Sequence, residues 1–341
     1  MERRPDRPGD AAGCEPCPSP DEAVAAMRTD FTIVVVTHDS APELERLLAS
    51  ARRFLRPRPP IVVVDTGSHD DSSAVAQRYG CTVLELPAGT GFGAACNAGI
   101  ERATTDVTVL VNPDCELRNG DLRQLASFAH ARRCLAVPRL LNSDGSVQDS
   151  AHPRPGTGAA ILGAISPRPL LPRALRLRVE PYRTDVPRPV GWAIAACLAA
   201  PTKLLRELGP FEPDDFLFYE DLDLCLRAAD VGVDTWYVPS VELVHTGGTS
   251  VQRAFGEHVA ALKAARRREV VKRRLGRVAL AVDDACELAT YALRLSARTL
   301  ARRPIERDRR CLRAHWNAIV AHPSGPGRQA DPVASRSHEE R

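Results

Sequence analysis

The chain has few aromatic residues and no long hydrophobic run. Phe, Trp and Tyr make up 5% of its 341 residues, and no basic stretch carries the interleaved aromatic side chains typical of nucleic-acid binding. The richest apolar stretch, Val190 to Ala200, has 11 residues and includes Gly191, so it is too short to cross a bilayer. The first residues are rich in Arg, Pro and Asp and lack the apolar core of a signal peptide, which predicts a cytoplasmic protein.

The ten cysteines are scattered, and they do not form the paired spacings of a zinc site. Cys14 and Cys17 make a single CxxC pair with no second pair at suitable spacing. Most of the others have apolar neighbours in a chain without an export signal. We therefore expect reduced, buried thiols rather than disulfides.

Charge is distributed unevenly along the chain. Residues 1–250 hold 26 Lys and Arg against 33 Asp and Glu, whereas residues 251–341 hold 20 against 10. This asymmetry predicts two parts with different partners. We expect a disordered leader (1–28), a catalytic domain (29–250), a basic helical extension (251–325) and a disordered tail (326–341).

The first half of the catalytic region alternates between short apolar strands and helices. Such strands are typical of a mostly parallel sheet that helices cover on both faces. The predicted strands are residues 31–37, 61–65, 81–86 and 107–111. The second half is less regular: we expect a Pro- and Arg-rich loop over 153–189, one strand-like segment over 190–200, a helix over 202–208, a strand over 234–238, and helices from about 255 to 320.

Polar residues follow three of the predicted strands. Thr37-His38-Asp39, Asp65 and Asn112-Pro113-Asp114 each stand at a strand end. In open α/β sheets, ligands bind outside the carboxyl ends of the strands. These three groups therefore predict a single ligand-binding crevice.

An acidic segment, Phe218 to Arg227, combines three carboxylates with a helical stripe. Leu222, Cys225, Leu226 and Ala229 recur at the spacing of a helix packed on a core. A packed helix that carries Glu220 and Asp221 in its first turn holds them at a fixed place, as a general base requires. The alternative is that these acids only cap the helix and interact with its dipole. Asp223 lies about 200° around the helix from Asp221 and is expected to point away.

Together these segments resemble the family 2 inverting glycosyltransferases with the GT-A fold, in particular the rhamnosyltransferase-like branch. The resemblance runs from Phe31 to about Ser250. The segments that carry it are residues 33–40, 62–70, 91–97, 110–114, 139–146, 218–225 and 244–248. It implies an α/β fold with a Rossmann-like sheet, followed here by the basic α-helical extension.

The resemblance also implies roles for individual residues. Asp221 would be the catalytic base and Glu220 its neighbour that orients a substrate. Asp114 and His245 would bind a divalent metal, Mn²⁺ or Mg²⁺, and the imidazole favours Mn²⁺. The residues implied in nucleotide-sugar binding are Thr37, His38, Asp39, Asp65, Gly91, Phe92, Asn97, Asn112 and Trp192. Structural alternatives stand beside several of these roles: a turn for Asp65, a loop histidine for His245, core packing for Trp192, and an ordinary strand-to-helix loop for Gly91, Phe92 and Asn97.

By resemblance, the enzyme transfers a hexosyl or rhamnosyl group from a dTDP- or UDP-sugar to a glycan or lipid-linked acceptor in cell-envelope polysaccharide synthesis. The basic extension suits the inner face of an anionic plasma membrane, and the alternatives are a solvated helical bundle or a homodimerisation element. A second function class is a catalytically silent GT-A domain that binds nucleotide-sugars as a scaffold. A third, a nucleotidyltransferase, predicts a Gly-rich basic loop after the first strand, where this chain has Thr37-His38-Asp39.

Overall fold

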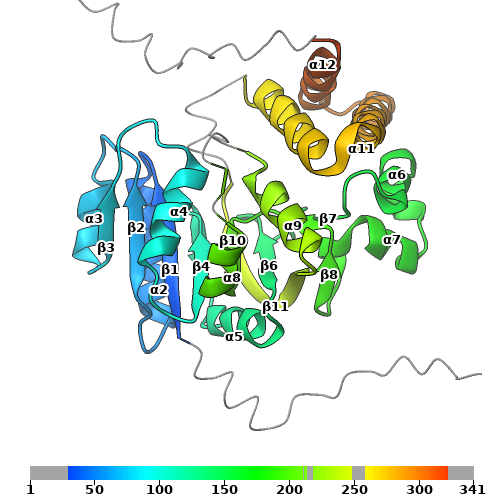
Figure 1. The fold of residues 1–341 in the computed structure, drawn as a ribbon. Coiled ribbons are helices and arrows are strands. Elements are labelled where there is room, and N and C mark those ends of the chain that lie inside the picture. Colours follow the sequence, from blue (N-terminus) through cyan, green and yellow to red (C-terminus); the bar gives the residue numbers. More distant parts are fainter. Residues whose placement is uncertain (1–29, 210, 213–217, 248–257, 322–341) are drawn as a thin grey trace, which may run out of the picture.

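The computed structural model describes residues 30–209, 211–212, 218–247 and 258–321. Within these residues, nine strands form one sheet in the order β3-β2-β1-β4-β10-β6-β11-β5, and β8 pairs with β11. Figure 1 shows helices on both faces of this sheet and the C-terminal helices gathered beyond one end of it. The strands are β1 (Phe31–Thr37), β2 (Ile61–Asp65), β3 (Thr82–Glu85), β4 (Val107–Val111), β5 (Cys115–Leu117), β6 (Leu135–Leu141), β8 (Arg188–Val190), β10 (Cys197–Pro201) and β11 (Thr235–His245).

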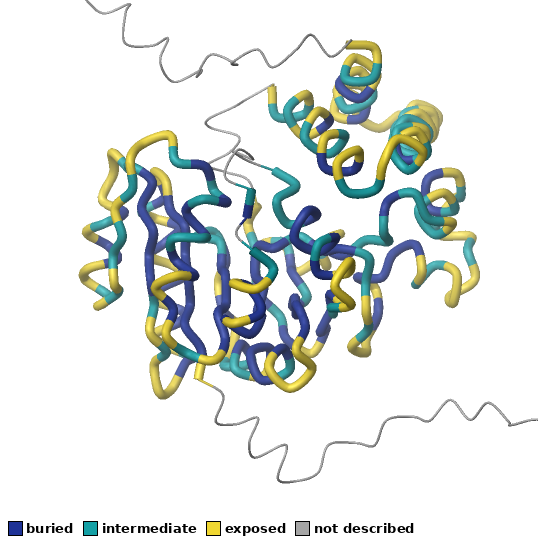
Figure 2. The backbone as a smooth tube through the Cα atoms, viewed as in Figure 1, coloured by how far each residue is buried: buried dark blue, intermediate teal, exposed yellow. Residues whose placement is uncertain are grey.

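The sheet is mostly parallel, as the sequence predicts. β1 pairs in parallel with β2 and β4, β2 with β3, and β6 with β11. β5, β8 and β10 run antiparallel to their neighbours, a feature that the continuous apolar runs do not reveal. The central strands are buried along their whole length, which Figure 2 shows as a dark core between more exposed helices. Burial on both faces explains why these strands are mostly apolar and rich in Val.

The helices of the N-terminal half lie between the strands, as strand–helix alternation predicts. They are α2 (Ala41–Phe54), α3 (Ser72–Arg78), α4 (Phe92–Arg102) and α5 (Leu122–Arg132). In the second half, α8 (Thr202–Glu207) and α9 (Glu220–Asp230) follow. The acidic segment therefore forms a helix that begins at Glu220, as expected.

The predicted loop over 153–189 is wrong, because this segment contains ordered helices. They are α6 (Gly158–Ile165), η1 (Arg168–Leu170), α7 (Arg173–Val179) and η2 (Pro181–Arg183). The buried carboxylate of Glu180 organises them: Arg176 and Arg183 lie 2.9 Å from it, and Arg168 lies 3.5 Å from it. The arginines that make the segment look like a solvated loop instead neutralise a buried charge.

The single strand-like segment predicted over 190–200 is also wrong in part. It is divided between the end of β8, the two-residue strand β9 (Trp192–Ala193) and β10. β9 leaves the large sheet and pairs with β7 (Ala151–His152). Gly191 permits this change of partner, because a Cβ there would lie 1.9 Å from the backbone nitrogen of Arg154.

The C-terminal region is helical, as predicted, and it contacts the acidic helix. α11 (Val259–Leu300) is broken at Gly276, which has a φ of 83°, and α12 (Glu306–Val320) packs against α11. α11 also contacts α9 and α6. No helix in the described ranges combines the length and hydrophobicity of a membrane span.

Several predictions concern residues beyond those that the structure describes. The leader, the tail and the boundary at residue 250 lie in or beside residues 1–29, 248–257 and 322–341, so the domain division stays a prediction. Cys14 and Cys17 also lie outside. The eight cysteines of the described ranges are free thiols and five of them are buried, which confirms the expectation of reduced thiols for this part of the chain.

Candidate active site

The carboxyl ends of β1 and β2 lie side by side, because Thr37 and Asp65 are partners in the parallel register. Asp65 is buried, and its two oxygens accept hydrogen bonds from the Ser68 backbone N–H at 2.7 Å and the Ser73 hydroxyl at 2.9 Å. This is the turn that the structural alternative predicts. The buried Thr37 hydroxyl has no hydrogen-bond partner among the described residues, and a bound ligand or water would satisfy it.

The loops after β1 and β2 are joined through Asp39. Its Oδ1 accepts a hydrogen bond from the His69 N–H at 2.7 Å, and its own N–H donates to Ser68 Oγ at 3.0 Å. Asp39 holds a left-handed backbone (φ 45°), which is uncommon outside glycine. His38 and Asp39 have half-exposed side chains. His38 and Asp39 therefore present exposed polar groups beside the carboxyl ends of β1 and β2.

The N-terminal end of α4, which includes Gly91 and Phe92, supports the loop that precedes the acidic helix. Asn97 donates from Nδ2 to the Phe211 carbonyl at 2.9 Å and accepts from the Phe211 N–H at 2.8 Å. A Cβ at Gly93 would lie 2.9 Å from the Phe211 Cβ, so the glycine permits this close approach. The Asn97 amide is thus engaged in positioning Phe211, and its predicted contact with a nucleotide-sugar stays a prediction.

Asp114 and His245 meet at the sheet edge because β11 ends where β5 begins. His245 and Cys115 are partners in the antiparallel register, and Asp114 directly precedes β5. The His245 Nε2 lies 3.4 Å from the Asp114 Oδ1, and each side chain is 12% exposed. Thr246 also donates from its backbone N–H to the Asp114 carbonyl at 3.1 Å.

Gln148 fixes the orientation of the His245 ring. Its Nε2 donates to the His245 carbonyl at 2.6 Å, so its Oε1 faces the His245 Nδ1 at 3.0 Å and requires a hydrogen there. In the neutral imidazole, Nε2 then presents a lone pair to a carboxylate oxygen 3.4 Å away. An imidazole nitrogen beside a carboxylate oxygen is a donor set that a divalent metal fits.

Cys115 completes the group of metal-ligand types at this position, because its Sγ lies within 4.8 Å of the Asp114 and His245 ligand atoms. Its thiol donates to the Ala196 carbonyl at 3.3 Å. Burial raises the pKa of the Cys115 thiol well above its ordinary value, so the sulfur stays protonated and is a poor ligand. Asp114 and His245 are therefore the two residues of this group whose ligand atoms could hold a divalent metal.

Asp221 lies in the first turn of α9 and is held by two backbone donors. Its Oδ1 accepts from its neighbour Leu222 at 2.7 Å, and its Oδ2 accepts from the Ala195 N–H at 3.3 Å. Burial raises the pKa of Asp221 to about 6, although these hydrogen bonds and the charge of Lys263 lower it. The helix terminus alone would make Asp221 a weaker base. Because desolvation outweighs this effect, the carboxylate is ionised at neutral pH and basic enough to accept a proton.

Ala195 and Ala196 connect Asp221 to the segment that carries Asp114. Ala195 donates to Asp221, while the adjacent Ala196 carbonyl accepts from the Asn112 N–H at 2.8 Å and from the Cys115 thiol. Two neighbouring residues thus hold Asp221 and the segment of Asp114 near each other.

Trp192 is 6% exposed, and its ring stacks on the His152 ring with centroids 4.4 Å apart. This is the core packing that the alternative predicts, and a sugar contact stays a prediction.

The backbone before α9 is unusual, because Phe218 and Tyr219 both have positive φ angles, 73° and 64°. Residues in this region cost about 1–3 kcal/mol each and persist where the surroundings impose them. They bring Glu220 to α4, where its charge adds to the effect of burial in raising the pKa of the Cys96 thiol. Asp221 instead faces Ala195, so the two acids occupy different places.

Comparisons with known proteins agree with this geometry. The family model for glycosyl transferase family 2 matches residues 32–190. An N-acetylglucosaminyl-diphospho-decaprenol L-rhamnosyltransferase of Mycobacterium tuberculosis is 32% identical over 255 residues, which cover 69% of this chain and 82% of that protein. The chain belongs to glycosyl transferase family 2. It is therefore a glycosyltransferase, and the predicted family and enzyme class are confirmed.

Solved structures with the same architecture confirm the GT-A fold of this family 2 glycosyltransferase. A mannosyltransferase from Pyrobaculum calidifontis, solved with GDP-Man and Mn²⁺, has a TM-score of 0.52 at 17% identity and covers 86% of this chain and 85% of its own. A glucosyl-3-phosphoglycerate synthase from Mycobacterium tuberculosis, solved with Mn²⁺, UDP and phosphoglyceric acid, has a TM-score of 0.50 at 16% identity, with 80% and 84% covered. At these identities the likeness shows the fold alone.

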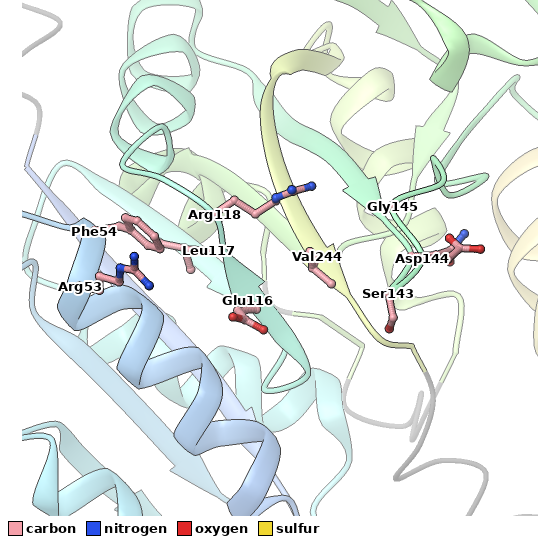
Figure 3. A pocket seen from close by; sticks show the side chains of 10 residues that line it. Arg53, Phe54, Glu116, Leu117, Arg118, Ser143, Asp144, Gly145 and Val244 are labelled. Atoms are coloured by element: carbon pink, nitrogen blue, oxygen red, sulfur yellow. The ribbon is translucent and has the colours of Figure 1, made fainter.

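A pocket of about 500 Å³ lies at the same sheet edge of the glycosyltransferase but outside the crevice. Figure 3 shows Glu116 and Val244 among its lining side chains. These two are register partners one residue away from Cys115 and His245, so they point to the opposite face of the sheet. The pocket is therefore distinct from the Asp114–His245 pair.

Sequence reasoning missed two residues near this site. Gln148 fixes the His245 ring but lies in an irregular segment between strands, where no periodic signal marks it. Lys263 lies on α11 in the basic extension, and its positive charge lowers the pKa of Asp221. Only the packing of distant segments brings either residue to the site.

Proposed function

We propose that this enzyme transfers a rhamnosyl group, with inversion, from a nucleotide-diphosphate donor to a hydroxyl of a lipid-linked acceptor in cell-envelope polysaccharide synthesis. The observation that carries the proposal is the Asp221 carboxylate, whose pKa of about 6 suits a base. Ala195 donates a hydrogen bond to this carboxylate, and the adjacent Ala196 accepts one from Cys115, the residue after Asp114. The 32% identity to a rhamnosyltransferase whose name specifies a diphospho-lipid acceptor supports the donor sugar and the acceptor class.

Inversion requires one displacement at the anomeric carbon. Asp221 accepts the proton of the acceptor hydroxyl as that oxygen attacks, so no enzyme nucleophile is needed. Glu220 orients a substrate beside α4. Backbone donors from Leu222 and Ala195 hold the Asp221 carboxylate in place, so little reorganisation accompanies proton transfer.

Asp114 and His245 would hold a divalent metal ion, and Asn112 lies beside them. When bound, this ion would neutralise charge on the donor diphosphate. The imidazole ligand favours Mn²⁺ over Mg²⁺. The nucleotide would lie along Thr37, Asp39 and Asp65, where the unpartnered Thr37 hydroxyl supports a polar ligand. The base of the donor is thymine or uracil.

The direct test is sugar transfer by the purified protein with Mn²⁺. A short-chain prenyl diphosphate that carries N-acetylglucosamine serves as acceptor, with dTDP-rhamnose and UDP-sugars as donors. We expect rhamnosylated product with inverted anomeric configuration, detected by mass spectrometry and NMR. Donor binding without turnover on any acceptor would instead support a silent scaffold, a function that the intact Asp221, Asp114 and His245 oppose.

The Asp114→Ala variant tests the metal-binding pair in the same assay. Loss of the carboxylate is expected to lower kcat by about 100-fold or more, because charge on the departing diphosphate is no longer neutralised. Thermal stabilisation by dTDP with Mn²⁺ should fall in parallel. Asp106→Ala is the matched control, since this exposed aspartate precedes β4 at the opposite end of the strand from Asp114. Equal activity of the two variants would contradict the assignment.

We also propose that α12 contacts the inner face of the plasma membrane. Arg309, Arg313, Trp316 and Val320 are exposed and recur at helical spacing along one stripe. Basic residues with an exposed tryptophan suit an anionic lipid interface. This arrangement would bring the enzyme to a lipid-linked acceptor.

Sedimentation with vesicles tests the membrane contact. The protein is expected to bind vesicles that contain phosphatidylglycerol, and high salt should release it because it screens surface charge. Trp316→Ala should weaken binding, whereas Trp236→Phe, at a partly buried position against the core, is the control. Equal binding to neutral phosphatidylcholine vesicles, or no binding to either, would exclude the proposal and favour a homodimer or a solvated bundle.

A further inference from the structure

The first half of α11, residues 259–275, is fixed to the acidic helix through one buried carboxylate. Asp223 is 1% exposed. Its Oδ1 accepts hydrogen bonds from Arg273 at 3.0 Å and from Arg274 Nε at 2.7 Å, while its Oδ2 accepts from Arg227 at 2.8 Å. The rotation of α11 about its own axis is therefore set relative to α9.

That rotation brings one face of α11 over the turn that precedes the base. Lys263, Arg267 and Arg274 are spaced by four and seven residues, so they share this face. The Lys263 Nζ lies 4.8 Å from the centroid of the Phe218 ring, and the Arg267 guanidinium lies 5.7 Å from that of the Tyr219 ring. These aromatic residues directly precede Glu220 and Asp221.

Two of the three cations on this face, Lys263 and Arg267, differ in what they bind. Arg267 is paired with Asp283 at 2.7 Å and lies 3.4 Å from Glu287, both on the second half of α11. Within the described part of the chain, Lys263 has no carboxylate partner at ion-pair distance. Desolvation lowers the pKa of the Lys263 ammonium, while the charges of Asp221 and, more weakly, Glu220 oppose that shift. Lys263 therefore lies over the turn that leads into both acids, and no described carboxylate neutralises it at ion-pair distance.

We propose that Lys263 binds the diphosphate of the lipid-linked acceptor. This inference rests on the proposed function, because it takes the acceptor class from it. The donor diphosphate is assigned to Asp114 and His245, whereas Asp221 must face the acceptor hydroxyl. A cation over the Phe218 ring, in the turn that leads into Asp221, thus lies on the acceptor side of the reaction. The flexible lysine stem allows the ammonium to reach an anionic group one sugar away from the attacking oxygen.

Two acceptors that differ only in charge test this assignment. One is N-acetylglucosamine on a short-chain prenyl diphosphate, and the other is the same sugar on an uncharged alkyl glycoside. Lys263→Gln is expected to raise KM for the diphosphate acceptor about tenfold, which is the size of one charge-assisted hydrogen bond. KM for the alkyl glycoside and for dTDP-rhamnose should not change, and Lys263→Arg should restore most of the affinity.

Lys272→Gln is the matched control, because Lys272 is exposed on the same helix about 180° around from Lys263. Its KM values should equal those of the wild type. An equal effect of Lys263→Gln on both acceptors, or an effect on the donor alone, would overturn the assignment. So would the absence of any effect.

A binding measurement separates this inference from the proposed function. Calorimetry with a short-chain prenyl diphosphate, in the presence of saturating dTDP and Mn²⁺, requires no turnover. We expect Lys263→Gln to weaken this binding about tenfold. If the sugar transferred is not rhamnose, this result still holds. If the affinities of wild type and variant are equal, the inference fails even where rhamnosyl transfer succeeds.

Discussion

Replacing Asp221 with Asn is expected to lower kcat for sugar transfer by about 10²–10⁴-fold, the usual contribution of a general base. The amide has nearly the same shape, and its oxygen can still accept the hydrogen bond from Leu222 that Asp221 accepts at 2.7 Å. It cannot accept the proton of the acceptor hydroxyl. Because the donor site is unchanged, binding of the nucleotide-sugar should be retained. Initial rates over a range of acceptor concentrations measure the effect.

The pH dependence of the wild type gives a second readout of the same residue. Burial raises the pKa of Asp221 to about 6, so the carboxyl becomes protonated and inactive as a base below that pH. kcat/KM should therefore rise about tenfold per pH unit below 6 and level off above it. The residual rate of Asp221→Asn should lack this limb.

Asp230→Asn is the control for this series, since Asp230 is the exposed last residue of the same helix. It should leave both kcat and the pH profile unchanged. Full activity in Asp221→Asn would exclude Asp221 as the base. A pH limb that persists unchanged in the variant would assign the ionisation near 6 to another group.

The part of the site that lies at strand ends was predictable from the sequence. A buried parallel strand is a short apolar run, and the first polar residue after it marks the sheet edge where ligands bind. Thr37, Asp65 and Asn112 follow this pattern, and the structure brings the first two into register. The helical period also predicted that Asp223 points away from Asp221, and its contacts with Arg227 and Arg274 confirm this.

Other parts depend on contacts that no local pattern encodes. The arginines of residues 168–183 look like a solvated loop in sequence, yet they surround Glu180. Gln148 and Lys263 approach the site from an irregular segment and from the C-terminal helix. The Asn97 amide, which the resemblance implies in donor binding, holds Phe211 in the structure. Gln148, Lys263 and Asn97 have partners that lie far away in sequence. Glu180 is a charged residue that can be buried because several arginines surround it.

Asp223→Ala is expected to lower the free energy of unfolding by about 3–5 kcal/mol, the cost of removing one partner from a buried ion cluster. The substitution leaves Arg227, Arg273 and Arg274 close together without the carboxylate that they share. Urea denaturation followed by circular dichroism measures the loss. Asp230→Ala is the control, because its 3.8 Å contact with Arg154 is exposed and worth no more than about 1 kcal/mol.

The pH dependence of the Asp223 effect has a definite sign. Burial raises the pKa of Asp223, but hydrogen bonds from Arg274 and Arg227 more than offset it, so the pKa lies below its ordinary value. The carboxylate therefore stabilises the fold fully above the unfolded-state pKa of about 3.9, and this contribution is lost as pH falls through the folded-state value. The difference in stability between wild type and Asp223→Asn should be constant near neutral pH and shrink in acid. A difference that grows in acid would contradict the ion cluster as its cause.

The same substitution separates the two roles that α11 has in this enzyme. If Asp223 fixes the rotation of α11, its loss should also move Lys263 away from Phe218 and raise KM for the charged acceptor, even where the protein is still folded. Asp223→Asn, which keeps the shape of the side chain but not its charge, should show this effect at temperatures well below its melting transition. The alkyl glycoside, which lacks the diphosphate, should be affected less. Equal losses on both acceptors would mean that Asp223 supports the base through α9 alone, because α9 carries both Asp221 and Asp223.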